Sequence, residues 1–85
     1  MGKRIGIVAI IIEERESVPK ANAILSAYAS IIIGRMGIPY KEKHVNVISI
    51  IVDGTTDEIG ALSGKLGNLI GVTAKTVLAK ENQER

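Results

Sequence analysis

Two short segments of this chain, residues 4–12 and 44–53, are apolar on both of their alternating faces. They constrain the fold more than any other feature of the sequence. Successive side chains of a strand point to opposite sides of a sheet, so strands of this kind are central and covered on both sides. Asn46 and Ser49 are the polar exceptions in the second segment. The chain is therefore expected to form a sheet with these two strands at its centre.

A third strand is expected over residues 31–40, IIIGRMGIPY. Pro39 has no backbone N–H to donate to a central ladder, which places this strand at an edge of the sheet. Gly34 and Gly37 indicate a bulge or the close approach of another backbone. The charged residues 41–43 then predict a hairpin turn that leads into the second apolar segment.

A helix is expected over residues 17–30 and a fourth strand over residues 72–80. Ser17 can cap the helix, and Pro19 in its first turn loses no helical hydrogen bond. With the second helix described below, the element order is β-α-β-β-α-β. This is the ferredoxin-like pattern of the α+β class, in which two helices cover one face of a four-stranded antiparallel sheet. The apolar residues on the bare face predict an obligate homo-oligomer, a dimer or a tetramer.

The second helix is expected within Thr55–Gly71, TTDEIGALSGKLGNLIG. Thr55 and Glu58 form a capping-box signature, in which each side chain pairs with a free backbone N–H group. The apolar positions recur at helical spacing and form one face: Ile59, Leu62, Leu66, Leu69 and Ile70. Beside that face lies a stripe of glycines: Gly60, Gly64, Gly67 and Gly71. The last of these is expected to be the left-handed residue just past the helix end.

The glycine stripe requires an explanation, since each glycine inside a helix costs roughly 0.5–1 kcal/mol relative to alanine. Three interpretations remain open: tight packing against the other helix of the same domain, contact with a second subunit, or a ligand cleft. The Gly64-Lys65 pair does not form a phosphate-binding loop. The glycine spacing is one residue short, Leu66 replaces the required Ser or Thr, and the segment is helical.

Composition narrows the class of protein. Eighty-five residues, 46% of them hydrophobic, form one domain over residues 1–85, with a polar tail over residues 81–85. Tyr28 and Tyr40 are the only aromatic residues, and the net charge is +2, so direct nucleic-acid binding is not expected. The chain has no cysteine and no apolar run of about 20 residues. A cytoplasmic protein that is not bound to a membrane is the expectation.

The sequence contains few residues that could catalyse a reaction or bind a metal ion. His44 is the only histidine and is expected to be a surface or packing residue, so no metal set can be completed. Glu13, Glu14 and Glu16 read as a solvated loop, with a weak divalent-cation site as the alternative. No catalytic residue and no cofactor are expected, and the chain is not expected to be an enzyme. Arg35 lies in an otherwise apolar strand, where its head either points into water or binds a carboxylate or phosphate.

Two blocks of the sequence carry a family resemblance. The block DEIGALSGKLG at residues 57–67, with Gly71-Val72 and Lys75-Thr76 behind it, resembles the small proteins labelled as regulators of the iron-only hydrogenase system. The block RMGIP at residues 35–39 is similar to a strand motif of the same family. The resemblance implies an ACT-like ferredoxin fold, similar to the C-terminal domain of nickel-responsive repressors, and a cytoplasmic oligomeric regulatory module.

Two departures limit what the resemblance implies. The nickel ligands of those repressors have no counterparts here because His44 stands alone, so nickel sensing is not expected. No DNA-binding segment is recognised ahead of the domain, so DNA binding would need a partner chain. ACT domains commonly bind amino acids at the loop after the first strand. Here that loop is charged and carries Arg15 in place of a glycine, which disfavours an ordinary amino-acid site.

The expected function is that of an oligomeric sensor module that binds a small effector at a subunit boundary and shifts between assembly states. Arg35 is the expected anion contact of the ligand site. The glycines expected to permit close approach are Gly34, Gly37, Gly60 and Gly64. The alternative is a ligand-free module whose glycine-rich helix or edge strand docks on a larger protein partner.

Overall fold

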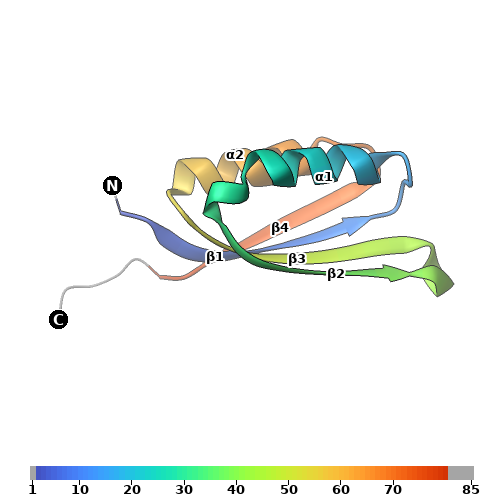
Figure 1. Ribbon diagram of the computed structural model, residues 1–85, viewed down its shortest axis with the longest axis horizontal. Coiled ribbons are helices and arrows are strands. Elements are labelled where there is room, and N and C mark those ends of the chain that lie inside the picture. The colour runs from blue at the N-terminus through green and yellow to red at the C-terminus, as the bar shows by residue number, and fades with distance from the viewer. Residues whose placement is uncertain (1, 81–85) are drawn as a thin grey trace.

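The computed structural model describes residues 2–80 of the chain. Two helices form one layer over a four-stranded sheet (Figure 1). The elements occur in the predicted β-α-β-β-α-β order, with two short 3-10 segments between them: β1 (Arg4–Ile12), α1 (Ser17–Ala27), η1 (Ala29–Ile31), β2 (Ile32–Tyr40), η2 (Lys41–Lys43), β3 (Val45–Gly54), α2 (Thr56–Gly67) and β4 (Val72–Leu78). The predicted tail over residues 81–85 lies outside the described residues.

The sheet has the order β2-β3-β1-β4, and every neighbouring pair is antiparallel. The two doubly apolar strands, β1 and β3, are therefore central, as predicted from their composition. Pro39 lies in β2 at an edge of the sheet, where its missing N–H breaks no ladder between central strands. The predicted irregularity of β2 is confirmed as a register shift between Ile32 and Gly34.

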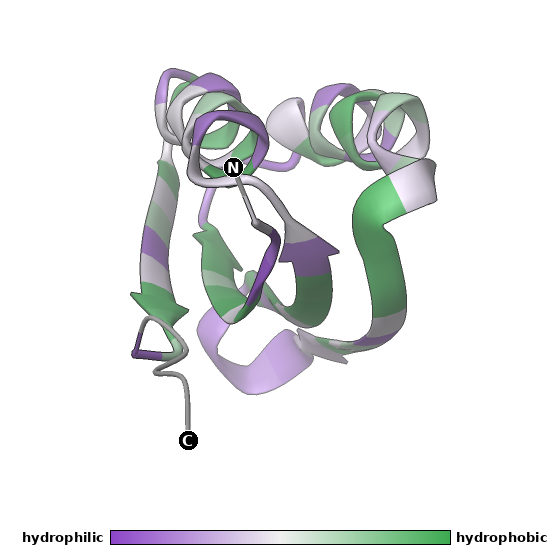
Figure 2. Cartoon of the chain, turned by 90° about the vertical axis from the view of Figure 1, so that its left-hand side faces the viewer, coloured by the Kyte–Doolittle hydropathy of each residue, from purple (hydrophilic) through white to green (hydrophobic). Residues whose placement is uncertain are grey.

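The alternation of side chains divides β1 and β3 into two rows with different environments. The helix-facing row is buried, while the opposite row lies on a face of the sheet that the helices do not cover. The strands are predominantly apolar on a hydropathy scale, with the helices packed along one side of the sheet (Figure 2). The buried apolar core of the described residues consists of Val8, Ile10, Ile12, Ala21, Leu25, Ile31, Ile48, Ile50, Val52, Ile59, Leu62 and Leu66.

The N-terminus of α2 has the predicted capping box. The backbone N–H of Glu58 donates to the Thr55 hydroxyl at 3.1 Å, and the backbone N–H of Thr55 donates to the Glu58 carboxylate at 2.8 Å. The helix is shorter than the expected stretch, because it ends at Gly67 rather than near Gly71. The predicted inclusion of Ile70 in the buried face is therefore wrong, and that side chain is 76% exposed.

Gly71 has the predicted left-handed backbone, with φ at +71°, but it lies in the turn that enters β4 rather than at the helix cap. Its carbonyl accepts a hydrogen bond from the backbone N–H of Glu13 at 2.7 Å. A Cβ added at Gly71 would lie 2.5 Å from the side chain of Glu14. This glycine therefore permits a close contact between the turn and the loop that follows β1.

Helix α1 does not begin as predicted. Glu16 occupies the cap position, and Ser17 is instead a buried helical residue whose hydroxyl donates to the carbonyl of Ile70 at 2.6 Å. The serine therefore connects the start of α1 to the turn after α2. The helix ends at Ala27 rather than near Ser30, since a separate 3-10 turn carries the chain into β2.

Candidate functional site

The uncovered side of the sheet, called the open face below, is a surface of exposed apolar side chains. Its members come from all four strands, and the strand register places them next to one another across the sheet. Each is between 40% and 67% exposed within the chain: Ile5, Ile7, Ile11, Met36, Ile38, Tyr40, Val47, Ile51 and Val77. Monomeric proteins rarely expose contiguous apolar patches of more than a few hundred Å². Larger exposed apolar patches mark interaction sites.

The predicted ligand residues do not converge in a single chain. Gly34, Arg35 and Gly37 lie on edge strand β2, whereas Gly60 and Gly64 lie on exposed positions of α2. The guanidinium of Arg35 donates from Nη2 to the amide oxygen of Asn22 on α1 at 3.1 Å. Arg35 therefore points to the helix-facing side of the sheet, over the outer edge of the α1 layer.

The glycine stripe of α2 is not a packing device within the domain. A Cβ added at Gly60, Gly64 or Gly67 would meet nothing within 4 Å, so the first of the three interpretations is wrong. The stripe forms an exposed, smooth strip of helix. On the same helix, the Lys65 ammonium lies 5.6 Å from the ring centroid of Tyr28 at the end of α1, a cation–π contact between the two helices.

A hollow of about 580 Å³, called the hairpin pocket below, lies at the end of the molecule where β2 and β3 are joined. Its floor is one row across three strands, in which Ile12 pairs with Asn46 and Asn46 pairs with Pro39. This row is on the helix-facing side, and Ile12 within it is buried. The β2–β3 hairpin projects beyond the start of α1 (Figure 1), so Asn46 is only partly covered and Pro39 is exposed.

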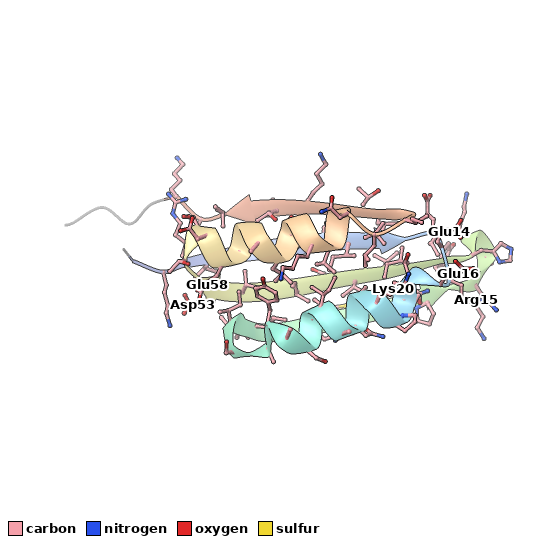
Figure 3. The ribbon with its side chains drawn as sticks, turned by 90° about the horizontal axis from the view of Figure 1, so that it is seen from above. Glu14, Arg15, Glu16, Lys20, Asp53 and Glu58 are labelled. Atoms are coloured by element: carbon pink, nitrogen blue, oxygen red, sulfur yellow. The ribbon has the colours of Figure 1, made fainter. Side chains whose placement is uncertain are left out.

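The walls of the hairpin pocket come from two turns that are far apart in the sequence. Glu13 and Arg15 lie in the loop between β1 and α1, and Lys41 and His44 lie at the turn between β2 and β3. Figure 3 shows Arg15 with its neighbours at this end of the molecule, whereas Asp53 and Glu58 lie at the other end. Sequence reasoning did not find this site, because only the strand register brings the two turns together.

The chemistry of the hairpin pocket is predominantly basic. Within residues 2–80, the side chains of Arg15, Lys41 and His44 have no hydrogen-bond or ion-pair partner. His44 also has a left-handed backbone, with φ at 57°, which is uncommon for a residue other than glycine. One acidic residue, Glu13, lines the same hollow. The arrangement therefore offers an anion several exposed donors that no other side chain occupies.

Tyr40 connects the hairpin pocket to the open face, because it lines the first and is exposed on the second. Its hydroxyl donates a hydrogen bond of 2.7 Å to the carboxylate of Glu42. That bond, and secondarily desolvation, raise the pKa of Tyr40 above its ordinary value of 10.0. The Tyr40 hydroxyl therefore donates to Glu42 at the rim of the pocket.

Metal ions in proteins are most often held by acidic, histidine and cysteine side chains. In the described part of the chain there is no group of three or more such residues that could hold a metal ion, and this includes Glu13, Glu14 and Glu16. Among residues 2–80, no helix has the length and apolar character needed to cross a membrane.

The topology and layers define an ACT-like domain of the ferredoxin-like class, as predicted. The chain belongs to the TM1266-like family, described as "Iron-only hydrogenase system regulator, putative", whose model matches residues 4–76. No curated protein sequence matches the chain.

Solved structures give the same fold. An uncharacterised protein, TM1266 from Thermotoga maritima, has 35% sequence identity and a TM-score of 0.88, and the match covers 92% of this chain and 99% of that one. A "putative glycine cleavage system transcriptional repressor" has 9% identity and a TM-score of 0.68, covering 98% of this chain and 49% of the other. The C-terminal domain of the MgtC protein from Mycobacterium tuberculosis has 14% identity and a TM-score of 0.68, covering 99% and 96%. The last two likenesses concern the fold alone.

Proposed function

We propose that this chain is a cytoplasmic regulatory module that assembles into a homo-oligomer through its open face and binds a small effector at the subunit boundary. Its family is described in connection with the iron-only hydrogenase system, and the module would act on that system. The mechanism is a population shift, in which the effector binds one assembly state more tightly than another. The observation that carries the proposal is the open face.

The magnitude of the apolar exposure favours association. Fully burying a side chain of this size contributes about 1.5–3 kcal/mol. The nine members of the open face are 40–67% exposed, close to half on average. Covering them therefore contributes about 7–13 kcal/mol per protomer, or about twice that for two protomers. Association costs roughly 4–15 kcal/mol, so the apolar term exceeds the cost over most of this range.

A second candidate function has its own supporting observation, the exposed glycine strip of α2. A helix without side chains along one strip accepts the close approach of another helix, which is what a docking surface for a larger protein partner requires. In this alternative the chain binds no effector and acts as a protein-interaction module. The open face would then still pair two copies, and Gly60 and Gly64 would contact the partner.

The test combines light scattering with a thermal-shift screen of the purified chain against amino acids, nucleotides, organic acids and divalent metals. The proposal expects a stable oligomer and a saturable shift with at least one compound class. A ligand present at about a hundred times its dissociation constant stabilises the folded state by about 2.7 kcal/mol, which such a screen detects in a small domain. A stable oligomer with no shift favours the interaction module. A monomer at all concentrations contradicts the role of the open face.

A further inference from the structure

We propose that the hairpin pocket binds a small organic dianion, a phosphate ester or a dicarboxylate, through Arg15, Lys41 and His44. This inference rests on the proposed function, because it assigns the effector site and the chemical class of the effector. None of the residues expected from the sequence to form the effector site lines this pocket: Gly34, Arg35, Gly37, Gly60 and Gly64. The argument uses the shape of the hollow, the charges on its walls, the polar group in its floor and the backbone of His44.

The hollow has the size of a small-molecule site. Ligand pockets usually enclose about 300–1,000 Å³, and the hairpin pocket has about 580 Å³. Its floor and rim are apolar at Ile12, Pro39 and Val45, so a ligand with a short carbon skeleton has surface to cover. A bare inorganic ion would leave these apolar contacts unused, which favours an organic anion.

The charges on the walls select an anion. Arg15 and Lys41 carry two positive charges, Glu13 carries one negative charge, and His44 adds a donor that is cationic when protonated. Arg15 comes from one turn and Lys41 with His44 from another, so the basic groups approach a ligand from two sides. Hydrogen bonds from ionised donors to carboxylate or phosphate are about twice as strong as neutral ones. Two separated cationic groups match a ligand that carries two negative charges.

Asn46 gives the floor of the pocket a polar group at a position where the helix-facing row of β3 would otherwise have an apolar side chain. It faces the helix side of β3, in the row whose other strand residues before Gly54 are Ile48, Ile50 and Val52. Within residues 2–80 its side-chain amide has no hydrogen-bond partner. An amide at the bottom of a basic hollow can donate to a ligand oxygen and fix the ligand's orientation.

His44 is held in a conformation that glycine or asparagine adopts more readily. Residues other than glycine that are kept in the left-handed region are frequent at ligand sites, where the surrounding structure holds them in this conformation. The backbone N–H of His44 donates to the carbonyl of Lys41 at 3.2 Å, which closes the turn and places both side chains on the wall of the pocket. A glycine in this place would suit the turn and would remove the imidazole.

The pocket also meets the boundary at which an effector would influence assembly. Tyr40 is 44% exposed on the open face and lines the pocket as well. A second copy seated on the open face would cover Tyr40 and so contact the rim of the site. Ligand binding and assembly would then be coupled through shared contacts, as reciprocal linkage requires.

The test is a two-dimensional ¹H–¹⁵N NMR titration of the full chain with succinate and, separately, with glycerol phosphate, with sodium chloride at equal ionic strength as the control. The proposal expects saturable shifts of the Arg15, His44 and Asn46 amides with at least one dianion and none with chloride. The compound that binds more tightly shows whether the pocket prefers two carboxylates, as in succinate, or a phosphate ester, as in glycerol phosphate. Inorganic phosphate in a third titration should bind more weakly than the preferred organic dianion.

Variants separate a built site from general attraction to positive charge. Lys41→Gln and Arg15→Gln should each weaken binding about tenfold or more, since each removes a charge-assisted hydrogen bond. Glu13→Gln should tighten binding, because it removes from the pocket wall a negative charge that repels the dianion. The matched control is Lys3→Gln, which makes the same change of charge next to the opposite end of β1 and should leave affinity unchanged.

His44→Gly is the variant that distinguishes ligand binding from folding. It should weaken binding while the thermal midpoint stays equal or rises, because the left-handed backbone suits glycine. Unchanged affinity in this variant would remove His44 from the site, and equal loss in Lys41→Gln and Lys3→Gln would overturn the pocket. Sedimentation velocity on the same samples keeps the two proposals apart. Binding to a monomer supports the pocket and contradicts assembly through the open face. An oligomer without saturable shifts supports assembly through the open face and contradicts the pocket.

Discussion

Ile7→Glu tests the open face at its centre. Ile7 is 45% exposed and pairs with Ile51 on one side and Val77 on the other, which are both members of the open face. In a symmetric dimer each interface residue counts twice. Losing the burial of the exposed part of Ile7 costs about 0.7–1.4 kcal/mol per protomer. An unpaired buried carboxylate costs at least about 1–3 kcal/mol more.

The two terms together destabilise a dimer by about 3–9 kcal/mol. At about 1.4 kcal/mol per tenfold change, the dissociation constant should rise at least roughly a hundredfold. Folding of the protomer should change little, because Ile7 lies outside the buried core of the single chain. Sedimentation velocity over a series of protein concentrations measures the dissociation constant, and circular dichroism checks the fold.

The matched control is Ile70→Glu. Ile70 is 76% exposed in the turn between α2 and β4 and is not a member of the open face, so the same chemical change should leave the molecular mass unaltered. If Ile7→Glu and the unmodified chain have the same mass at every concentration, the open face is not the assembly surface. A loss of mass in both variants would point to a non-specific effect of the added charge.

Three further predictions follow from the glycines and from Tyr40. Gly64→Ala should raise the free energy of unfolding by about 0.5–1 kcal/mol in thermal or urea unfolding, because an added Cβ meets nothing within the chain; a decrease that accompanies a loss of assembly would instead assign Gly64 to an interface. Gly71→Ala should destabilise the chain by more than about 1 kcal/mol in urea unfolding, since φ is +71° and the Cβ would collide with Glu14, and an unchanged midpoint would refute this reading of the turn. Glu42→Gln should lower the pKa of Tyr40 toward its ordinary value, measured by the ring signal of Tyr40 in an NMR titration. Since the folded pKa of Tyr40 is raised, the contribution of this bond to stability is present below pH 10.0 and is lost as the pH rises through the raised value. If Tyr40 titrates identically in Glu42→Gln, the hydrogen bond to Glu42 is not the cause of the raised pKa.

Local patterns in the sequence were sufficient for the elements and for much of their arrangement. A continuous apolar run ended by charged residues predicted the bounds of β1, and apolar residues on both faces identified β1 and β3 as central, since only central strands need two apolar faces. Pro39 placed β2 at an edge by removing one donor. The capping box of α2 was predicted because it is a contact between residues three apart. The family blocks at residues 35–39 and 57–67 also lie within the matched region.

The predictions that failed required knowledge of what lies opposite a residue. Ser17 could cap a helix or reach the carbonyl of Ile70, and only the packing of α1 beside the α2–β4 turn decides for the second. The stripe of Gly60, Gly64 and Gly67 showed that something can approach α2, but not which surface does so. Within the chain none does, and the close approach occurs at Gly71 instead.

The hairpin pocket shows most clearly what the tertiary structure alone decided. The sequence by itself determined that Glu13 and Arg15 follow one strand and that Lys41 and His44 flank a turn about thirty residues later. The antiparallel register, which pairs Ile12 with Asn46 and Asn46 with Pro39, brings these two turns to one end of the sheet. The physical reason is that register is set by the burial of whole strand faces. The position of a charged turn is a consequence of that burial, and no local pattern around the turn encodes it.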